Sequence, residues 1–396
     1  MIEAAINRNI ALKILNPSAK DLEHGLELHK NSFVFDAYGF MPLPGGTPER
    51  KKELIDAGAS RDEIQFASEM YRMTEAFQDP QIRKLLAEAW EFSGVDCIFQ
   101  NCGEESNDVE RLLKRLGNYT RTIDYCDDIY ERCVYPEKLE GIRARGKKAL
   151  YITTNGVPVS SKFISAEENL HLVQSFFNLG VRMMHLTYNR RNLMGDGCAE
   201  TANAGLSDFG RMAIAEMNRV GVIPDVAHSG QRTSLEAAQC SAKPVVASHS
   251  AVGKISTHYR AKCDEVIEAI KKTNGYIGIC CYPSFLQGRK NINGFLDHID
   301  YVVQKFGIDH VAIGTDRVAV LSRSGSSYPQ PKSRPIWEQY WTGDGVGRNE
   351  PEDFGSLAWT NWPLFTVGLV MRGYSDSDIQ KIIGGNVLRV CKDSMP

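Results

Sequence analysis

The 396-residue chain lacks any stretch of 18 or more apolar residues, and its first 15 residues carry Glu3, Arg8 and Lys13 where a secretory leader has an apolar core. These absences predict no membrane span and no secretion signal, so a cytoplasmic location is expected by default. The formal net charge is only −3. No basic excess therefore indicates a nucleic acid or an anionic membrane as a partner, and a small-molecule substrate is expected.

Paired metal-binding cysteines are also absent. The chain has ten cysteines, but none stands in a CxxC unit, which excludes a zinc-finger interpretation. Several lie inside apolar runs and are interpreted as buried small hydrophobic residues, without disulfides in a reducing compartment. No GxGxxG sequence follows the first predicted strand, which weakens a dinucleotide-binding interpretation, and no internal repeat is present.

What the sequence does contain is a series of short apolar or β-branched runs that read as strands buried on both faces. Eight such runs are predicted, at Ser32–Ala37, Val95–Asn101, Lys148–Thr154, Val181–Thr187, Gly221–Ala227, Lys243–Ser248, Gly275–Cys281 and Asp309–Thr315. Amphipathic segments between them predict helices at Arg61–Ser93, Leu206–Val220, Asp264–Thr273 and Leu296–Phe306, with Ser207 as an N-cap and Gly307 as a stop. Eight alternating units favour an α/β fold of the (β/α)8 TIM-barrel type, with a doubly wound open sheet as the alternative.

Two inserts interrupt this rhythm. One follows strand 1, at Met41–Gly94, and the other follows strand 8, over residues 317–356, which is rich in Ser, Gly, Pro, Arg and Trp. The position of the second insert at the carboxyl end of a strand predicts a lid or substrate loop, with a plain surface excursion as the alternative. Residues 1–30 form an N-terminal extension, two helices at Leu357–Arg372 and Ser375–Ile383 close the chain before Gly384 and Gly385, and the whole chain 1–396 is predicted to be one barrel domain.

Polar residues stand at the predicted carboxyl ends of the strands, where TIM barrels carry their chemistry. They are Asp36 and Tyr38 on strand 1, Asn155 on strand 3, Tyr188 on strand 4, Asp225 and His228 on strand 5, His249 on strand 6 and Asp316 on strand 8. Two histidines and a carboxylate at neighbouring strand ends favour a metal site, with His228, His249 and Asp316 as ligands. The other seven histidines, including His185, are interpreted as core or solvated residues.

Several long strings resemble the renal (membrane) dipeptidase family of amidohydrolase-like metallopeptidases. They are GLSDFGRMAIAEMNRVGVIPDVAH at 205–228, PVVASHS at 244–250, DHIDYVVQKFGIDHVAIGTD at 297–316 and RGYSDSDIQKIIGGNVLR at 372–389. The resemblance runs from about residue 31 to 390. It implies an amidohydrolase-like barrel, two zinc ions at its mouth, a dipeptide-like substrate and a homodimer.

The chain departs from this family at the metal ligands. The family's first-strand Asp-Gly-His-x-Asp motif reads Asp36-Ala37-Tyr38-Gly39-Phe40, so tyrosine and phenylalanine replace two ligands. The glutamate that bridges both metals in the family matches Asn155, whereas the later ligands match His228, His249 and Asp316. Two nearby cations need negative charge between them, and an amide does not supply it. We therefore expect the first metal position to be lost and one divalent metal, zinc or iron, or none, to remain.

Three function classes follow. The first is a one-metal hydrolase that cleaves an amide or related bond of a small carboxylate-bearing substrate. In it Asp316 handles the proton, Tyr188 donates to the developing oxyanion, and Arg260, which matches the family's carboxylate-binding arginine, holds the substrate together with Asn155. The second is a lyase, dehydratase or isomerase in which Tyr38, Tyr188, Asp36 and the histidines act as acids and bases. The third is an inactive relative that only binds a ligand.

Overall fold

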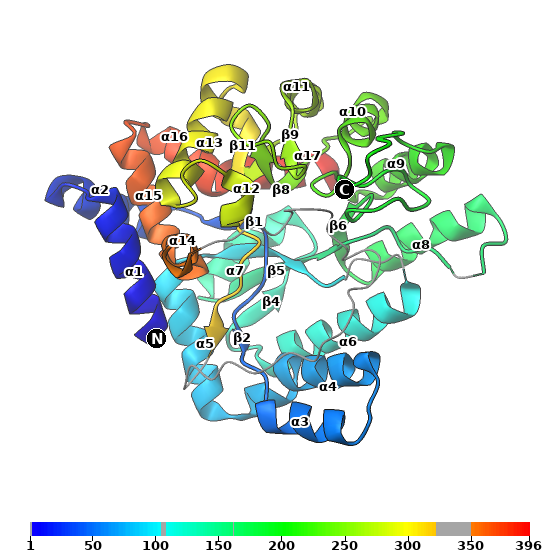
Figure 1. Cartoon of the computed structure of the whole chain (residues 1–396), viewed down its shortest axis with the longest axis horizontal. Coiled ribbons are helices and arrows are strands. Elements are labelled where there is room, and N and C mark those ends of the chain that lie inside the picture. The colour runs from blue at the N-terminus through cyan, green and yellow to red at the C-terminus, as the bar shows by residue number, and fades with distance from the viewer. Residues whose placement is uncertain (1, 104–107, 161, 322–349) are drawn as a thin grey trace.

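A ring of parallel strands forms the centre of the molecule, and helices surround it (Figure 1). The structure is a computed structural model, and it describes residues 2–103, 108–160, 162–321 and 350–396. The ring contains β1 (Phe35–Gly39), β3 (Cys97–Asn101), β5 (Lys148–Thr154), β6 (Val181–His185), β7 (Ile223–Asp225), β8 (Ala247–Val252), β10 (Ile277–Ile279) and β11 (Val311–Ile313). All eight predicted strands are thus confirmed, with ends shifted by a few residues. Their residues are fully buried except Lys148, as expected for strands covered on both faces.

The strands pair in the order β1-β3-β5-β6-β7 and, separately, β11-β10-β8, and two short seams join the two groups. At the first seam Val226 N donates to Val246 O (2.8 Å) and Val246 N donates to Pro224 O (3.1 Å), which links the ends of β7 and β8. At the second, Asp316 N donates to Tyr38 O (2.9 Å), which links β11 to β1. The predicted barrel is therefore confirmed as a curled parallel sheet closed by these bonds.

Most helices lie outside this ring, and the N-terminal pair packs beside the C-terminal helices (Figure 1). The α-helices are α1 (Ile2–Leu15), α2 (Ala19–Asn31), α3 (Pro48–Asp56), α4 (Arg61–Met73), α5 (Pro80–Ser93), α6 (Val109–Tyr125), α7 (Leu139–Ala144), α8 (Ala166–Asn178), α9 (Asp208–Val220), α10 (Gln231–Cys240), α11 (Asp264–Lys272), α12 (Pro283–Leu286), α13 (Ile292–Phe306), α14 (Pro351–Ser356), α15 (Trp362–Met371), α16 (Asp376–Gln380) and α17 (Asn386–Ser394). The predicted caps are confirmed: Ser207 accepts from Gly210 N, and Gly307 ends α13.

Short elements complete the described chain. They are strands β2 (Leu43–Pro44), β4 (Tyr130–Arg132), β9 (Ala261–Lys262) and β12 (Val320–Leu321), the 3-10 turns η1 (Glu75–Gln78), η2 (Pro136–Lys138), η3 (Ile308–His310) and η5 (Trp359–Asn361), and the π-turn η6 (Lys381–Gly385). Strand β12 pairs with β2, so the first residues after strand 8 lie against the insert after strand 1. The central part of the predicted lid, residues 322–349, lies outside the described residues.

One helix prediction is wrong. The segment Arg61–Ser93 is not one helix: α4 ends at Met73, η1 intervenes, and α5 starts at Pro80, whose ring fits the first turn of a helix but not its interior. The predicted stop at Gly384 is confirmed, because this residue has a non-helical φ of 179°. The helix α17 that follows it was not predicted. Within the described residues, no helix has the length and apolar character needed to cross a membrane.

Candidate functional site

Three buried histidines meet at the carboxyl ends of adjacent strands. His185 ends β6, His228 follows β7, and His249 lies in β8. One ring nitrogen from each can be chosen so that all three lie within 4.8 Å of one another. The Nε2 atoms of His228 and His249 are 3.0 Å apart. Such a set of imidazole nitrogens can hold one divalent cation.

The Nδ1 atom of each histidine has its own partner away from this centre. The contacts are His228 Nδ1 to Asn189 Oδ1 (2.8 Å), His249 Nδ1 to Ser248 Oγ (2.8 Å) and His185 Nδ1 to Thr154 O (3.0 Å). A carbonyl oxygen only accepts, so His185 and His228 carry a proton on Nδ1. In neutral rings this leaves the Nε2 lone pairs for a cation, which is how ligating histidines are usually oriented.

Asp225 places a carboxylate directly beside this cluster. Its Oδ2 atom lies 3.0 Å from His185 Nε2, but the two atoms are not aligned for a hydrogen bond and neither has another partner among the described residues. Its Oδ1 atom accepts from Ala227 N (2.8 Å) and Ser248 N (3.1 Å). Burial opposes ionisation, but His185 and these donors outweigh it and hold the pKa of Asp225 below its usual value. The negative charge favours a cation nearby.

His228 and His249 are held in the neutral, ligating form. Burial lowers the pKa of both rings well below the usual value, and the positive charge of Arg260 adds to the effect. A neutral imidazole has a lone pair to give to a metal, whereas a protonated one does not. The cluster is therefore chemically ready for a cation at neutral pH.

Tyr38 and Asn155, two of the three replacements at the expected first metal position, bind each other. The Tyr38 hydroxyl donates to Asn155 Oδ1 at 2.7 Å, and the Tyr38 ring stacks on His249 with centroids 3.8 Å apart. Both residues are buried. Burial raises the pKa of the Tyr38 phenol well above 10, which keeps it neutral and unsuited to metal binding. The residues at this position do not fit a second cation.

Tyr188 occupies the mouth above His228. Its ring stacks on the His228 ring with centroids 3.9 Å apart, and it is only half-buried. The structure therefore brings Tyr188 to the cluster, as predicted from its strand-end position. A phenol placed here can donate a hydrogen bond to a group bound at the cluster.

Asp36 is engaged entirely within the protein. Its carboxylate accepts from Thr315 Oγ1 (2.6 Å), Thr315 N (2.9 Å), Trp359 Nε1 (3.2 Å) and Tyr38 N (3.3 Å), and it is fully buried. These bonds join β1 to the end of β11 and to η5. The contacts favour a structural role, and the predicted catalytic role of Asp36 stays a prediction.

Arg260 presents free hydrogen-bond donors beside the cluster. The side chain is fully buried, and its Nη2 atom donates to His249 O at 2.7 Å. Its Nε and Nη1 atoms have no partner among the described residues. Each of these free donors is a ready hydrogen-bonding site for a carboxylate oxygen.

Asp316 lies at the barrel mouth, but its carboxylate does not belong to the group of possible metal ligands formed by the three histidines. Its backbone has a φ of 53°, the left-handed region that few residues other than glycine adopt. Burial raises the pKa of its carboxyl to about 6, against the opposing charges of Arg260, Arg317 and His185. A carboxyl of this kind can exchange a proton near neutral pH. In the metal cluster, the structure places His185 where the sequence predicted Asp316.

Sequence reasoning missed His185, which was interpreted as a residue with no part in the site. The alternation of side chains along β6 could have indicated its role. Met183 packs inside the barrel, and His185, two residues later, lies on the same face of the strand. A histidine in the last position of a barrel strand points toward the same mouth as the residues that follow the strand.

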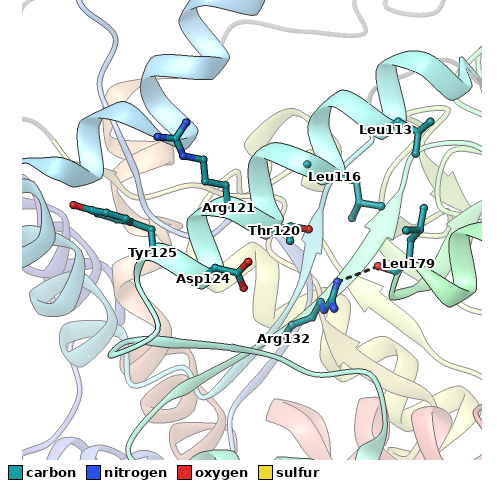
Figure 2. A pocket seen from close by; sticks show the side chains of 9 residues that line it. Leu113, Leu116, Thr120, Arg121, Asp124, Tyr125, Arg132 and Leu179 are labelled. Atoms are coloured by element: carbon teal, nitrogen blue, oxygen red, sulfur yellow. Dashed lines mark hydrogen bonds between the residues drawn. The ribbon is translucent and has the colours of Figure 1, made fainter.

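A surface hollow of about 680 Å³ lies elsewhere. Figure 2 shows its lining along α6, with Arg132 bonded to Leu179 O at 3.2 Å. Leu179 precedes β6, so this hollow lies at the amino end of the strands, opposite the histidine cluster. The volume of this hollow does not make it the candidate active site, because TIM barrels carry their catalytic residues at the carboxyl ends of the strands.

Comparison with known proteins agrees with this geometry. The model of the membrane dipeptidase family, peptidase family M19, matches residues 61–322. The dipeptidase tcpJ of Claviceps purpurea is 27% identical over 310 residues, which are 75% of this chain and 65% of that protein. An uncharacterized dipeptidase of Schizosaccharomyces pombe is 26% identical over 234 residues, 57% of this chain and 53% of that protein. The chain thus spans between about half and two thirds of the length of these curated relatives.

Solved structures show the same fold. An amidohydrolase from Pseudomonas aeruginosa superimposes with a TM-score of 0.68 at 24% identity, covering 93% of this chain and 98% of that one. A metallo peptidase from Rhodobacter sphaeroides, liganded with a phosphinate mimic of the dipeptide L-Ala-D-Ala, gives 0.64 at 17% identity, covering 92% and 100%. With the family model matching well over half of its residues, this barrel with histidines at its strand ends belongs to the membrane dipeptidase family, peptidase family M19.

Proposed function

We propose that this chain is a hydrolase that holds one divalent metal ion through His185, His228 and His249 and cleaves an amide or related bond of a small carboxylate-bearing substrate. The observation that carries the proposal is the cluster of three buried imidazoles with Nδ1 atoms already engaged. Zinc suits such a nitrogen-rich site, and iron is the alternative. When bound, the metal supplies Lewis-acid activation of water and of the scissile carbonyl.

The chain's own residues perform the remaining tasks. Arg260 binds the substrate carboxylate through one of its free donors, Nε or Nη1, which fixes the substrate relative to the cluster. Asp316, with its pKa raised to about 6, accepts a proton from the attacking water and returns it to the leaving amine. Tyr188 donates a hydrogen bond to the oxygen on which negative charge develops.

A metal-free, non-hydrolytic reaction is the second candidate. The 3.0 Å contact between His228 Nε2 and His249 Nε2 favours it, because two such nitrogens can share a proton when no cation separates them. With Tyr38 and Tyr188 stacked on these rings, the cluster then offers an acid–base set for a lyase or isomerase.

Elemental analysis of the purified protein, combined with turnover of a dipeptide panel, separates these candidates. We expect one zinc or iron ion per chain and metal-dependent turnover. His228→Ala should lose both, whereas His171→Ala, which removes an exposed histidine on α8, should lose neither. Two ions per chain would refute the one-metal site, and full turnover without metal would favour acid–base chemistry. Full turnover by His228→Ala would overturn the proposal.

A further inference from the structure

Two arginines stand at opposite ends of a row of three aromatic rings at the barrel mouth. The aromatic row consists of Phe285, Tyr282 and Phe354, with centroids 4.8 Å apart for Phe285 and Tyr282 and 5.5 Å apart for Tyr282 and Phe354. The Arg260 guanidinium lies 5.1 Å from the Phe285 centroid. The Arg317 guanidinium lies 4.8 Å from the Phe354 centroid. Cation–π contacts of this kind hold each charge in place while its donors stay free.

Both guanidinium groups have unused donors. Arg260 has buried Nε and Nη1 atoms without partners, and Arg317 has a buried Nε atom without one among the described residues. Both arginines also influence the Cys280 thiol. Burial raises the pKa of this thiol, and the positive charges of Arg260 and Arg317 both lower it. Cys280 follows β10 directly, so the two charges lie on the same side of the mouth.

The charge balance at this place is incomplete. The carboxylate of Asp316 is the neighbour that both arginines influence, and a single carboxylate neutralises at most one of them. Two positive charges in a poorly hydrated site repel each other and are costly to desolvate. An anionic group bound at each guanidinium would offset both costs, and charge-assisted hydrogen bonds would fix its position.

We propose that the substrate of this site carries two carboxylates, one bound by Arg260 and a second bound by Arg317. The role of Arg260 rests on the proposed function; the role of Arg317 is the new element. Arg317 is then a specificity-determining residue that selects an acidic side chain or an acidic acyl group over its neutral counterpart. The aromatic row gives the apolar part of such a substrate a surface to pack against.

Binding of unreactive probes tests this without relying on catalysis. Isothermal calorimetry would compare glutarate with its mono-amide glutaramate, which has nearly the same shape but only one carboxylate. Succinate, adipate and pimelate would vary the span between the carboxylates. We expect the best dicarboxylate to bind about tenfold more tightly than its mono-amide, since a charge-assisted pair typically contributes a factor of this order.

Arg317→Met should remove this preference and leave binding of the mono-amide unchanged. Lys254→Met is the matched control, because it removes one positive charge from the exposed loop between β8 and β9 and should preserve the preference. Equal affinity for dicarboxylate and mono-amide, or a preference that persists in Arg317→Met, overturns the proposal. A protein that binds dicarboxylates selectively but hydrolyses nothing would refute only the proposed function. Thermal melting of each variant shows whether the fold is intact.

Discussion

The hydroxyl of Tyr38 donates a 2.7 Å hydrogen bond to Asn155 Oδ1, and this bond joins two of the three positions at which the chain departs from the family's metal ligands. The resemblance implies a histidine ligand at one position and a bridging glutamate at the other. Here the two replacements satisfy each other in a buried place. This bond satisfies both polar groups within the protein, without a cation.

Tyr38→Phe should therefore weaken the fold while leaving the metal content unchanged. The variant keeps the ring stacked on His249 but leaves the Asn155 carbonyl without its donor, which typically costs about 1–3 kcal/mol for a buried group. Urea denaturation measures the loss, and elemental analysis measures the metal. Tyr125→Phe removes a hydroxyl from a tyrosine that is 46% exposed and serves as the control. A drop in metal content with unchanged stability would show that Tyr38 is itself a ligand.

Restoring the family's ligands should restore its second metal. The triple variant Tyr38→His, Phe40→Asp and Asn155→Glu supplies two ligands and the carboxylate that offsets repulsion between two cations. We expect one additional metal ion per chain by elemental analysis. Asn155→Glu alone should not gain it, because the phenol of Tyr38 and the ring of Phe40 still occupy the place of the other ligands. A second ion in the single variant would contradict the view that this position is closed by the aromatic pair.

Asn189 should matter for metal affinity through the ring that it orients. Its Oδ1 atom accepts from His228 Nδ1 at 2.8 Å, and its backbone has a φ of 51°, which glycine adopts without strain. Asn189→Gly removes the acceptor but tolerates the backbone, so affinity should fall about 10–100-fold with little loss of stability. Asn189→Asp keeps an acceptor and should retain most of the affinity. Competition with a zinc chelator gives both numbers, and equal affinities for the two variants would count against this role.

Asp36 should make the fold less stable as pH rises. Burial raises its pKa to about 7 in the folded chain, from 3.8 in the unfolded one. Between about pH 4 and about pH 7 the folded chain therefore keeps a proton that the unfolded chain releases. The free energy of unfolding then falls as pH rises, by on the order of 1.4 kcal/mol per pH unit within this window, and levels off beyond it.

Asp36→Asn isolates this effect. The variant does not titrate, so its unfolding free energy should lack the slope, although it should be lower at all pH values because an amide NH2 group now faces the donors of Thr315 and Trp359. Chemical denaturation at several pH values measures both slopes. Identical slopes for the variant and the natural chain would assign the pH dependence to other groups.

The strands were predictable because each is a continuous apolar run, and packing did not override that signal. The helix break at Gly384 was also predictable from its glycines, and a Cβ there would lie 2.4 Å from Phe33 O, so the glycine allows a close approach as well. The helix break before Pro80 was not predicted. The 3-10 turn before Pro80 depends on packing around Phe77, which is completely buried. Contacts between residues far apart in the sequence are not visible in a local sequence pattern.

Part of the site was predictable for a similar reason. His228 and His249 stand at or just beyond predicted strand ends, and a barrel brings such residues together. His185 lies inside the predicted strand Val181–Thr187, and its role depends on where β6 ends and on which face it presents. The pairing of Tyr38 with Asn155 joins residues 117 positions apart, which no local pattern indicates. Contacts between side chains on different strands can be predicted only once the closed barrel is known.

The bonds made by Asp36 also constrain the order in which the molecule can be completed during synthesis. Its partners Thr315 and Trp359 lie 279 and 323 residues further along the chain. A ribosome has therefore made most of the protein before the carboxylate of the first strand can receive its donors. Contacts of such sequence separation form late and slow folding. Until then one edge of the first strand is unpaired and its carboxyl lacks these donors, so the incomplete barrel is exposed to pairing with other chains.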